Sequence, residues 1–311
     1  MATEIHRAMF ATTWHHAYSI WLFTFSDLKT IVFPQSFFGI LTALSQNMAA
    51  SKTHPTQDVG VNTLEIAPRV PLVFLWVYIN LLPFEINNQR QAESVREDRL
   101  NKPWRTMPSG KWTPTQALYA MWFFYLAAGL VSWQMGGLRW SLSLMVLGCW
   151  YNNLGGSDIN ALVRNLINGL GYTCFGIGSV EIALNVPVNM TLSTENTMLC
   201  SWIIIVALVV MTTVQTQDMG DQKGDAQRGC CSLPLQVGDG PARWITATFM
   251  LIWAPLCPCF WNSSWLGYFL TVPWALTVAF RCLVFRGVEE DQTTFRLWNI
   301  WIVSIYLLPV L

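Results

Sequence analysis

Residues 86–110 read "INNQRQAESVREDRLNKPWRTMPSG" and place three acids and five Lys or Arg in one short polar segment. This first polar segment lies between two long apolar stretches. A second polar segment at 217–229, "QDMGDQKGDAQRG", also follows an apolar stretch and again mixes acids with Lys and Arg. Such segments are unexpected in so apolar a chain, and the interpretation below depends on the two together.

The composition is that of a membrane protein. Of the 311 residues, 53% are hydrophobic and 12% are charged, whereas an average soluble domain is about 25% charged. The four longest stretches without a charged residue each exceed the roughly 20 residues with which a helix crosses a bilayer. They lie between Lys29 and Lys52, Lys111 and Arg139, Glu195 and Asp218, and Arg243 and Arg281. We therefore predict an all-α, polytopic membrane protein.

Apolar stretches along the whole chain predict nine transmembrane helices, at residues 30–49, 67–86, 113–133, 138–154, 160–184, 197–217, 242–260, 264–284 and 296–311. Residues 8–26, "AMFATTWHHAYSIWLFTFS", predict an amphipathic helix at the membrane interface before the first span. No low-complexity linker divides the chain. We expect one transmembrane domain over 1–311, with 1–29 as its N-terminal interfacial segment.

The distribution of Lys and Arg predicts the orientation. If the N-terminus is cytosolic, fourteen of the eighteen basic residues lie in or beside cytosolic segments, and only Lys52, Arg69 and Arg139 lie on the opposite side. The positive-inside rule favours this topology. Both N-x-S/T sequons, at Asn189 and Asn262, then face the lumen as candidate glycosylation sites. We expect a protein of the endoplasmic reticulum whose two polar segments share the cytosolic face.

Two other classes of function find no support. The formal net charge is zero, which gives no electrostatic case for a nucleic-acid partner. The eight Cys are scattered, and Cys257-Pro-Cys259 has no second Cys or His pair at zinc spacing. We expect the cysteines to be small buried hydrophobic residues.

The second polar segment has a pattern that favours a cation. Asp218, Asp221 and Asp225 are three and four residues apart, which places their carboxylates on one face of a helix. Like charges in this arrangement repel unless a cation lies between them. Hard oxygen ligands suit Mg²⁺, which commonly bridges protein carboxylates to substrate phosphates. A solvated acidic loop is an equally good interpretation of this segment alone.

The first polar segment adds the groups that a phosphate needs. Glu93 and Glu97 are four residues apart, as are Ser94 and Asp98. Pro103 ends the helical pattern between Lys102 and Arg105, and Lys and Arg bind phosphate oxygens. Membrane anchoring explains Arg96, Arg99 and Lys111, but it does not explain the acids. Two such segments on one face indicate a diphosphate held by Mg²⁺ at the mouth of a helical bundle. An apolar, aromatic interior suits a prenyl tail and a carbocation.

The segments "EDRLNKPWRTMPSG" and "DMGDQKGDAQRG" resemble those of the UbiA-type intramembrane prenyltransferases, as do "WYNNLGG" and "RNLINGLGY" around the fifth predicted span. Members of that family are nine-helix bundles with a central cavity and two Asp-rich motifs on one side. The resemblance covers nearly the whole chain. It implies the same fold, a Mg²⁺ cofactor and a prenyl diphosphate substrate.

The first motif departs from the family pattern. Asp98 fills the last acidic place, but Ser94 stands where the middle Asp belongs and Arg90 where the Asn belongs, while an Asn88-Gln89 pair occurs two residues early. This variant is similar to the fungal UbiA-type sesquiterpene cyclases. That resemblance implies an enzyme that ionises farnesyl diphosphate and cyclises the cation to a hydrocarbon such as β-trans-bergamotene, without an acceptor. An aromatic prenyltransferase acting on a phenolic or polyketide acceptor is the alternative, and a non-catalytic transporter or lipid-binding protein is a third interpretation.

The predicted site combines these arguments. The predicted metal ligands are Asn88, Glu93, Glu97, Asp98, Asp218, Asp221 and Asp225, of which Asp98, Asp221 and Asp225 are the predicted catalytic residues. The predicted diphosphate ligands are Lys102, Arg105, Arg164, Lys223 and Arg228. Because the first motif is altered, the sequence leaves open which of Glu93, Glu97 and Asp98 contact the metal.

Overall fold

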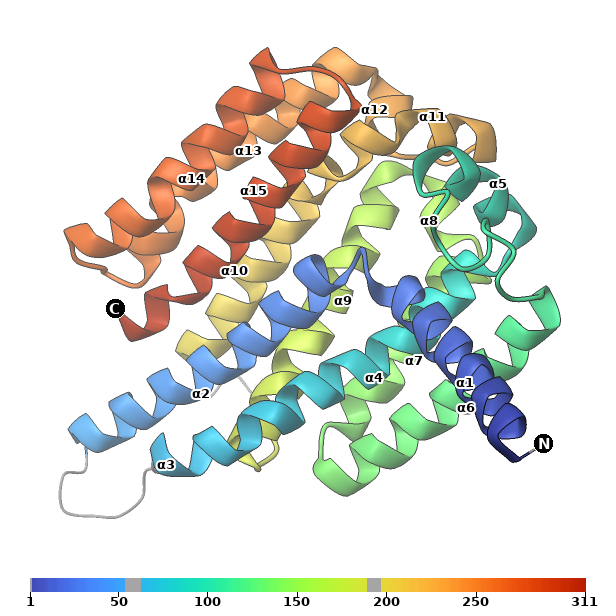
Figure 1. The fold of residues 1–311 in the computed structure, drawn as a ribbon. Coiled ribbons are helices and arrows are strands. Elements are labelled where there is room, and N and C mark those ends of the chain that lie inside the picture. The colour runs from blue at the N-terminus through green and yellow to red at the C-terminus, as the bar shows by residue number, and fades with distance from the viewer. Residues whose placement is uncertain (1, 54–62, 189–196) are drawn as a thin grey trace.

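A computed structural model describes residues 2–53, 63–188 and 197–311. All regular secondary structure in these ranges is helical. The long helices lie side by side as a bundle, and shorter helices cover one of its ends (Figure 1). The predicted all-α class is confirmed.

Nine long helices overlap the nine predicted apolar stretches one for one within the described ranges. They are α2 (Phe33–Thr53), α4 (Val70–Gln89), α6 (Pro114–Met135), α7 (Leu138–Asn152), α9 (Ala161–Leu184), α10 (Thr197–Thr213), α13 (Asp239–Phe260), α14 (Trp265–Val284) and α15 (Val288–Tyr306). Among the residues that the structure describes, five helical segments are long and apolar enough to cross a membrane: Leu28–Ser45, Ala67–Gln89, Thr197–Thr216, Asp239–Phe260 and Trp265–Val284. The membrane crossing of the other four helices stays a prediction.

Helix α9 is the central helix of the bundle. It packs against α2, α4, α7 and α10, and every residue from Cys174 to Ala183 is buried. The glycines of this helix suit such a position, because small residues let neighbouring helices approach closely.

Helix α1 (Ala2–Thr24) forms where residues 8–26 predicted a helix. Its buried residues are Ser19, Leu22, Phe23 and Thr24. The helix packs against α4, from which Gln89 Nε2 donates a hydrogen bond to the carbonyl oxygen of Phe23 at 2.7 Å. Trp14, Tyr18, Trp21 and Phe25 are exposed. These exposed aromatic side chains suit a membrane interface, which stays a prediction.

The remaining elements are short and lie mostly in the connections between the long helices. They are the π-helix η1 (Leu28–Val32), α3 (Thr63–Ile66), η2 (Ala67–Arg69), α5 (Ala92–Asn101), α8 (Gly156–Ile159), η3 (Val214–Thr216), α11 (Asp218–Arg228), α12 (Leu233–Val237) and η4 (Leu308–Val310). Helices α5 and α11 carry the acids of the two polar segments, and they pack against each other at one end of the bundle (Figure 1). The expectation that both segments share one face of the protein is confirmed.

Candidate active site

The connection between α4 and α5 sets which residues of the first motif face inward. Helix α4 ends at Gln89, and Gln91 is extended before α5 begins at Ala92. Arg90 donates a hydrogen bond from Nε to Asn87 Oδ1 at 3.1 Å and contacts Met121 of α6. Asn88 lines the cavity described below. Asn88 is still part of α4, where it lies one turn after Glu85 and on the same cavity wall.

A cavity opens at the end of the bundle where α5 and α11 meet. It holds about 1270 Å³ of empty space, counting the part that is open to solvent. Its polar wall contains the carboxylates of Asp27, Glu85, Glu97, Asp98, Asp218, Asp221 and Asp225 and the cations of Lys102, Arg105, Arg164 and Arg228. Seven carboxylates against four cations leave a formal excess of three negative charges. A bound diphosphate would add further negative charge, so the cavity as built calls for additional cations.

Three of these cations are paired with carboxylates of the predicted metal site. Lys102 Nζ lies 2.9 Å from Asp221 Oδ2, Arg164 NH2 lies 3.2 Å from Asp218 Oδ1, and Arg228 NH1 lies 3.1 Å from Glu97 Oε2. Two of the pairs, Lys102–Asp221 and Arg228–Glu97, connect the first polar segment to α11. The pairs hold the two segments together, and a metal–diphosphate would give each group a new partner of opposite charge.

Arg105 is surrounded by three carboxylates. Its NH1 lies 3.0 and 3.1 Å from the two oxygens of Asp98, and its NH2 lies 3.6 Å from Asp27 Oδ2 and 4.0 Å from Glu85 Oε2. Asp98 and Arg105 are both buried. The guanidinium of Arg105 thus orients Asp98, and both carboxylate oxygens of Asp98 already have a partner.

Asp27 and Glu85 were missed by the sequence analysis. Glu85 Oε2 accepts a hydrogen bond from Gln89 Nε2 at 2.9 Å, and both acids line the cavity. For Glu85 a signal existed, because an ionisable residue within an apolar membrane helix usually faces the interior of the bundle. Asp27 lies between α1 and η1, where no local pattern marks it.

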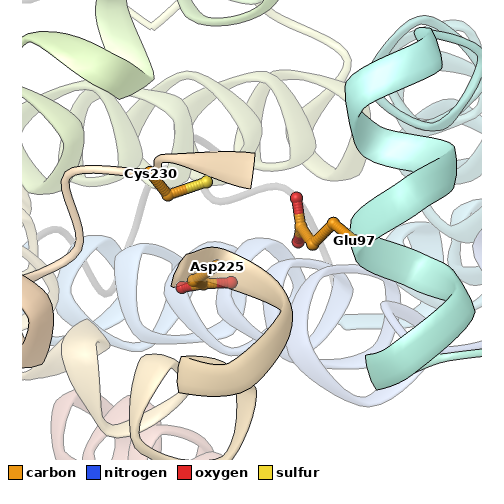
Figure 2. Close-up of side chains that lie close together, drawn as sticks. All are labelled: Glu97, Asp225 and Cys230. Atoms are coloured by element: carbon orange, nitrogen blue, oxygen red, sulfur yellow. The ribbon is translucent and has the colours of Figure 1, made fainter. Parts of the chain in front are cut away.

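Asp225 is the residue whose surroundings most favour a metal ion. It is buried, and its Oδ2 has no hydrogen-bond partner among the described residues. One ligand atom from each of Glu97, Asp225 and Cys230 lies within 4.8 Å of the other two, where α5 and the end of α11 face each other (Figure 2). Burial and, as the second cause, the negative charge of Asp218 raise the pKa of Asp225 to about 7.

The chemistry of this group fits a hard divalent cation. A buried carboxylate oxygen without a hydrogen-bond partner is energetically unfavourable, and a metal ion beside it would stabilise its negative charge. Burial and then the nearby Glu97 raise the pKa of the Cys230 thiol to about 12, so the thiol is neutral at physiological pH. Mg²⁺ binds oxygen ligands, and a neutral thiol is a poor one. The carboxylates of Asp225 and Glu97 therefore fit Mg²⁺ better than the thiol does.

The deeper wall of the cavity is mostly apolar, although it also contains Asn80. It is formed by Ile31, Leu81, Phe84, Leu144, Leu147, Ile167, Tyr172, Phe175 and Val214. The hydroxyl of Tyr172 donates a hydrogen bond to the carbonyl oxygen of Thr30 at 2.8 Å. A charged mouth and an apolar interior in one cavity suit an amphiphilic substrate.

Ten of the twelve residues predicted for the metal and diphosphate site line this cavity, and two do not. Glu93 is exposed and pairs with Arg96 at 3.1 Å. Lys223 is also exposed, because it lies two residues from both Asp221 and Asp225 and so on the opposite face of α11. Neither belongs to the cavity that the described residues form.

The two predicted glycosylation sites lie elsewhere. Asn262 is exposed in the turn between α13 and α14, at the other end of these helices from α11 (Figure 1). Asn189 lies outside the described residues.

Comparison with known proteins identifies relatives over nearly the whole chain. A model of the UbiA prenyltransferase family matches residues 70–302. The chain is 27% identical over 313 residues to somaliensene A/B synthase of Streptomyces somaliensis, covering 97% of this chain and 95% of that protein. It is 28% identical over 284 residues to fumagillin beta-trans-bergamotene synthase of Aspergillus fumigatus, covering 89% of this chain and 93% of that protein.

The fold is also found among solved structures. One is a UbiA homolog from Archaeoglobus fulgidus bound to GPP and Mg²⁺, with a TM-score of 0.54 and 10% sequence identity over 91% of this chain and 99% of that chain. At this level of identity the likeness concerns the fold alone.

Proposed function

Because this chain belongs to the UbiA prenyltransferase family, we propose that it is a membrane-bound terpene cyclase. In this proposal the enzyme ionises farnesyl diphosphate with Mg²⁺ and cyclises the carbocation to a sesquiterpene hydrocarbon such as β-trans-bergamotene, with release of diphosphate. The names of the two relatives, both terpene synthases, support cyclisation. The Archaeoglobus fulgidus homolog bound to GPP and Mg²⁺ supports the substrate class and the cofactor.

One observation carries the proposal. Acids from both polar segments, including Asp98, Asp221 and Asp225, line a single cavity whose deeper wall is apolar. A prenyl diphosphate has a strongly anionic head and an apolar tail, and this cavity offers a complementary surface to each. The carboxylates at the mouth are the groups that would bind divalent cations.

Different residues at the mouth of the cavity would bind the diphosphate and the metal during ionisation of the substrate. Mg²⁺ supplies positive charge that stabilises the departing diphosphate. Lys102, Arg164 and Arg228 would bind diphosphate oxygens, while Glu97, Asp218, Asp221 and Asp225 would hold the metal. As the C–O bond of the substrate breaks, its electron pair leaves with the diphosphate and an allylic cation remains in the apolar part of the cavity.

The apolar wall controls what the cation does next. The rings of Phe84, Tyr151, Tyr172 and Phe175 line the cavity, and aromatic faces attract a cation. A double-bond electron pair of the same chain attacks the cation and forms the ring bond. Loss of a proton to the departing diphosphate then leaves a new C=C bond. Exclusion of water keeps the cation from ending as an alcohol.

The altered first motif favours cyclisation over transfer to an acceptor. Ser94, in the place of an acid, lies on the cavity wall and its Oγ has no hydrogen-bond partner among the described residues. Arg90, in the place of the Asn, binds Asn87 instead. Transfer to a phenolic or polyketide acceptor stays the second candidate, because the family name covers prenyltransferases.

We place the protein in the endoplasmic reticulum membrane as one domain, with the cavity mouth toward the cytosol, residues 1–29 at the membrane interface, and Asn189 and Asn262 glycosylated in the lumen. Five helical segments able to cross a membrane support the membrane location. The excess of Lys and Arg around the acidic segments supports the orientation.

The function is tested with membranes that contain the full chain. Farnesyl diphosphate and Mg²⁺ are added without an acceptor, and the headspace and the released diphosphate are measured. A cyclic hydrocarbon supports the cyclase. Diphosphate release only after a phenolic acceptor is added would establish the prenyltransferase instead, and no release from any prenyl diphosphate would overturn both.

A further inference from the structure

The cavity has a measurable depth along the central helix. Its wall on α9 runs from Arg164, which pairs with Asp218 at the charged mouth, to Phe175. On α4 the wall runs from Asn88 inward to Asn80. Phe175 lies eleven positions after Arg164 in α9, which corresponds to about 16 Å at 1.5 Å per helical residue.

Trp76 lies just beyond the far end of this cavity, next to the lining residue Phe175. It lies on α4 one turn beyond Asn80 and is completely buried. Its ring packs on the backbone of Gly178 of α9 so closely that a Cβ at Gly178 would overlap the ring. The Trp76 ring also meets Phe175, the last cavity residue on α9, edge to face with centroids 6.5 Å apart.

The packing around Trp76 continues into a solid core. Val73, Val77 and Ile182 are fully buried in the same hydrophobic cluster as Trp76 and Phe175. The cavity therefore ends against side chains that are closely packed, as is typical of protein interiors. A substrate chain that reaches Phe175 cannot continue in the same direction.

Gly171 leaves space open halfway along the cavity, whereas packed side chains fill the space beyond its far end. It lies on the cavity wall of α9 between Asn168 and Phe175. A Cβ placed on Gly171 would meet no described atom within 4 Å. A side chain at this position would project into the space that the substrate needs.

We infer that Trp76 and Gly171 set the length of the prenyl chain that the enzyme accepts. Trp76, seated on Gly178, stops the chain at the far end, and Gly171 keeps the middle of the cavity open. For cyclisation the farnesyl chain must fold inside this space so that one of its double bonds reaches the cation. A longer chain needs more room than a cavity that is closed at its far end provides. The inference rests on the proposed function, since it concerns the tail of the same substrate.

The test compares C10, C15, C20 and C25 prenyl diphosphates on the full chain in membranes, with diphosphate release measured for each. The wild type is expected to have its highest kcat/KM with C15. Gly171→Leu is expected to lower kcat/KM for C15 about tenfold or more while sparing C10, because each added methylene group in a pocket matters on this scale. Trp76→Leu is expected to raise the C20 to C15 ratio of kcat/KM about tenfold, because the cavity becomes deeper.

A matched control separates chain-length control from loss of stability. Trp202 is as fully buried as Trp76, but it lies in another cluster, and its ring contacts Phe260 and Trp261 rather than Phe175. Trp202→Leu is expected to leave the C20 to C15 ratio unchanged, whatever its effect on the amount of folded protein. If Trp76→Leu does not fold, the series Gly171→Ala, Gly171→Val and Gly171→Leu tests the inference instead. The ratio of kcat/KM for C15 to kcat/KM for C10 should fall step by step along this series.

The outcomes distinguish the two proposals. If the wild type uses C25 better than C15, or if the Gly171 variants slow all chain lengths equally, the inference is wrong while the cyclase assignment stands. If the wild type releases no diphosphate from any of the four substrates, the proposed function itself is wrong and the inference is overturned with it.

Discussion

Asn101 and Gly224 join the two acidic helices. Asn101 Nδ2, at the end of α5, donates a hydrogen bond to the carbonyl oxygen of Asp221 at 3.0 Å, and Asn101 Oδ1 accepts one from the backbone N–H of Gly224 at 3.1 Å. The contact is so close that a Cβ on Gly224 would overlap the Asn101 amide. One side chain of the first motif therefore fixes the backbone of the second, between its carboxylates Asp221 and Asp225.

This contact predicts a metal-dependent defect in Gly224→Ala and in Asn101→Ala. Each substitution should displace α11 from α5 and move its carboxylates relative to Asp98 and Glu97. We expect diphosphate release to fall about 10- to 100-fold, because displacements of about 1 Å are this costly at an active site. The Mg²⁺ concentration that gives half of the maximal rate should rise in both variants. A Mg²⁺ titration of each variant against the wild type measures both effects.

Gly240 provides the control for this experiment. It lies in α13, and a Cβ there would meet no described atom within 4 Å. Gly240→Ala should keep the wild-type Mg²⁺ titration. A wild-type titration in Gly224→Ala as well would show that the distance between α5 and α11 does not govern metal binding.

Asp225 predicts a change in stability that depends on the metal. Its pKa is raised to about 7 in the folded protein, against about 3.9 in an unfolded chain. The folded state therefore loses stability as pH rises between these values, and above pH 7 the buried carboxylate carries its full cost. In EDTA at pH 8, Asp225→Asn should raise Tm by about 2–5 °C, because the charge is removed.

With Mg²⁺ present, the wild type should instead have a higher Tm than Asp225→Asn. Added Mg²⁺ is expected to raise the Tm of the wild type and to leave Asp225→Asn almost unchanged, because the variant lacks the ionised ligand. Glu289→Gln, an exposed acid of α15, should behave as the wild type throughout. An equal rise in Tm with Mg²⁺ in both Asp225→Asn and the wild type would remove Asp225 from the metal site.

The sequence predicted the helices well but not their ends. The last apolar stretch predicted a span at 296–311, whereas α15 begins at Val288. Its first turn contains Glu289, Glu290 and Asp291, which hydropathy excludes from a membrane helix. Acids are favourable at a helix N-terminus, and Asp291 in addition binds the buried Arg243 of α13, a partner 48 residues away that no local pattern reveals.

The predicted site residues show the same dependence on local patterns: residues that share one helix were identified, and those brought together by the fold were not. Spacing within one helix identified Asp218, Asp221 and Asp225, because helical periodicity is a local property. Asp27 and Glu85 line the cavity beside Arg105, which the fold brings to them from another segment. Lys223 was included for its residue type, although its position between Asp221 and Asp225 places it on the other face of the helix.

Glu93 and Lys223 should be dispensable. Both are exposed and lie outside the cavity, and exposed charges of this kind contribute about 0–1 kcal/mol. Glu93→Ala and Lys223→Ala should each keep diphosphate release within about fivefold of the wild type, since 1.4 kcal/mol corresponds to a factor of ten. Glu97→Ala and Lys102→Ala, which remove charges that line the cavity, are the comparison and should lose most activity. A large loss in Lys223→Ala would mean that α11 turns when substrate binds.

Asp291 should matter for stability rather than for chemistry. Arg243 is 2% exposed, and its guanidinium lies 2.7 and 2.8 Å from the two oxygens of Asp291 and 2.8 Å from Asp239 Oδ1. Removing one partner of a buried ion pair costs about 3–5 kcal/mol, because the other charge stays buried. Since Asp239 and the carbonyl oxygen of Cys282 still contact Arg243, we expect the lower end of that range for Asp291→Ala.

Thermal unfolding in detergent measures this effect, with Glu289→Ala as the control. Glu289 lies in the same helical turn of α15 but is exposed, so its removal should change Tm by less than about 1 °C, as for most surface substitutions. Asp291→Ala should lower Tm clearly, and the double variant Arg243→Met with Asp291→Ala should recover part of the loss, because no buried charge remains unpaired. If the double variant were less stable than Asp291→Ala, Arg243 would stabilise the ends of α13, α14 and α15 mainly through Asp239 and the backbone carbonyls.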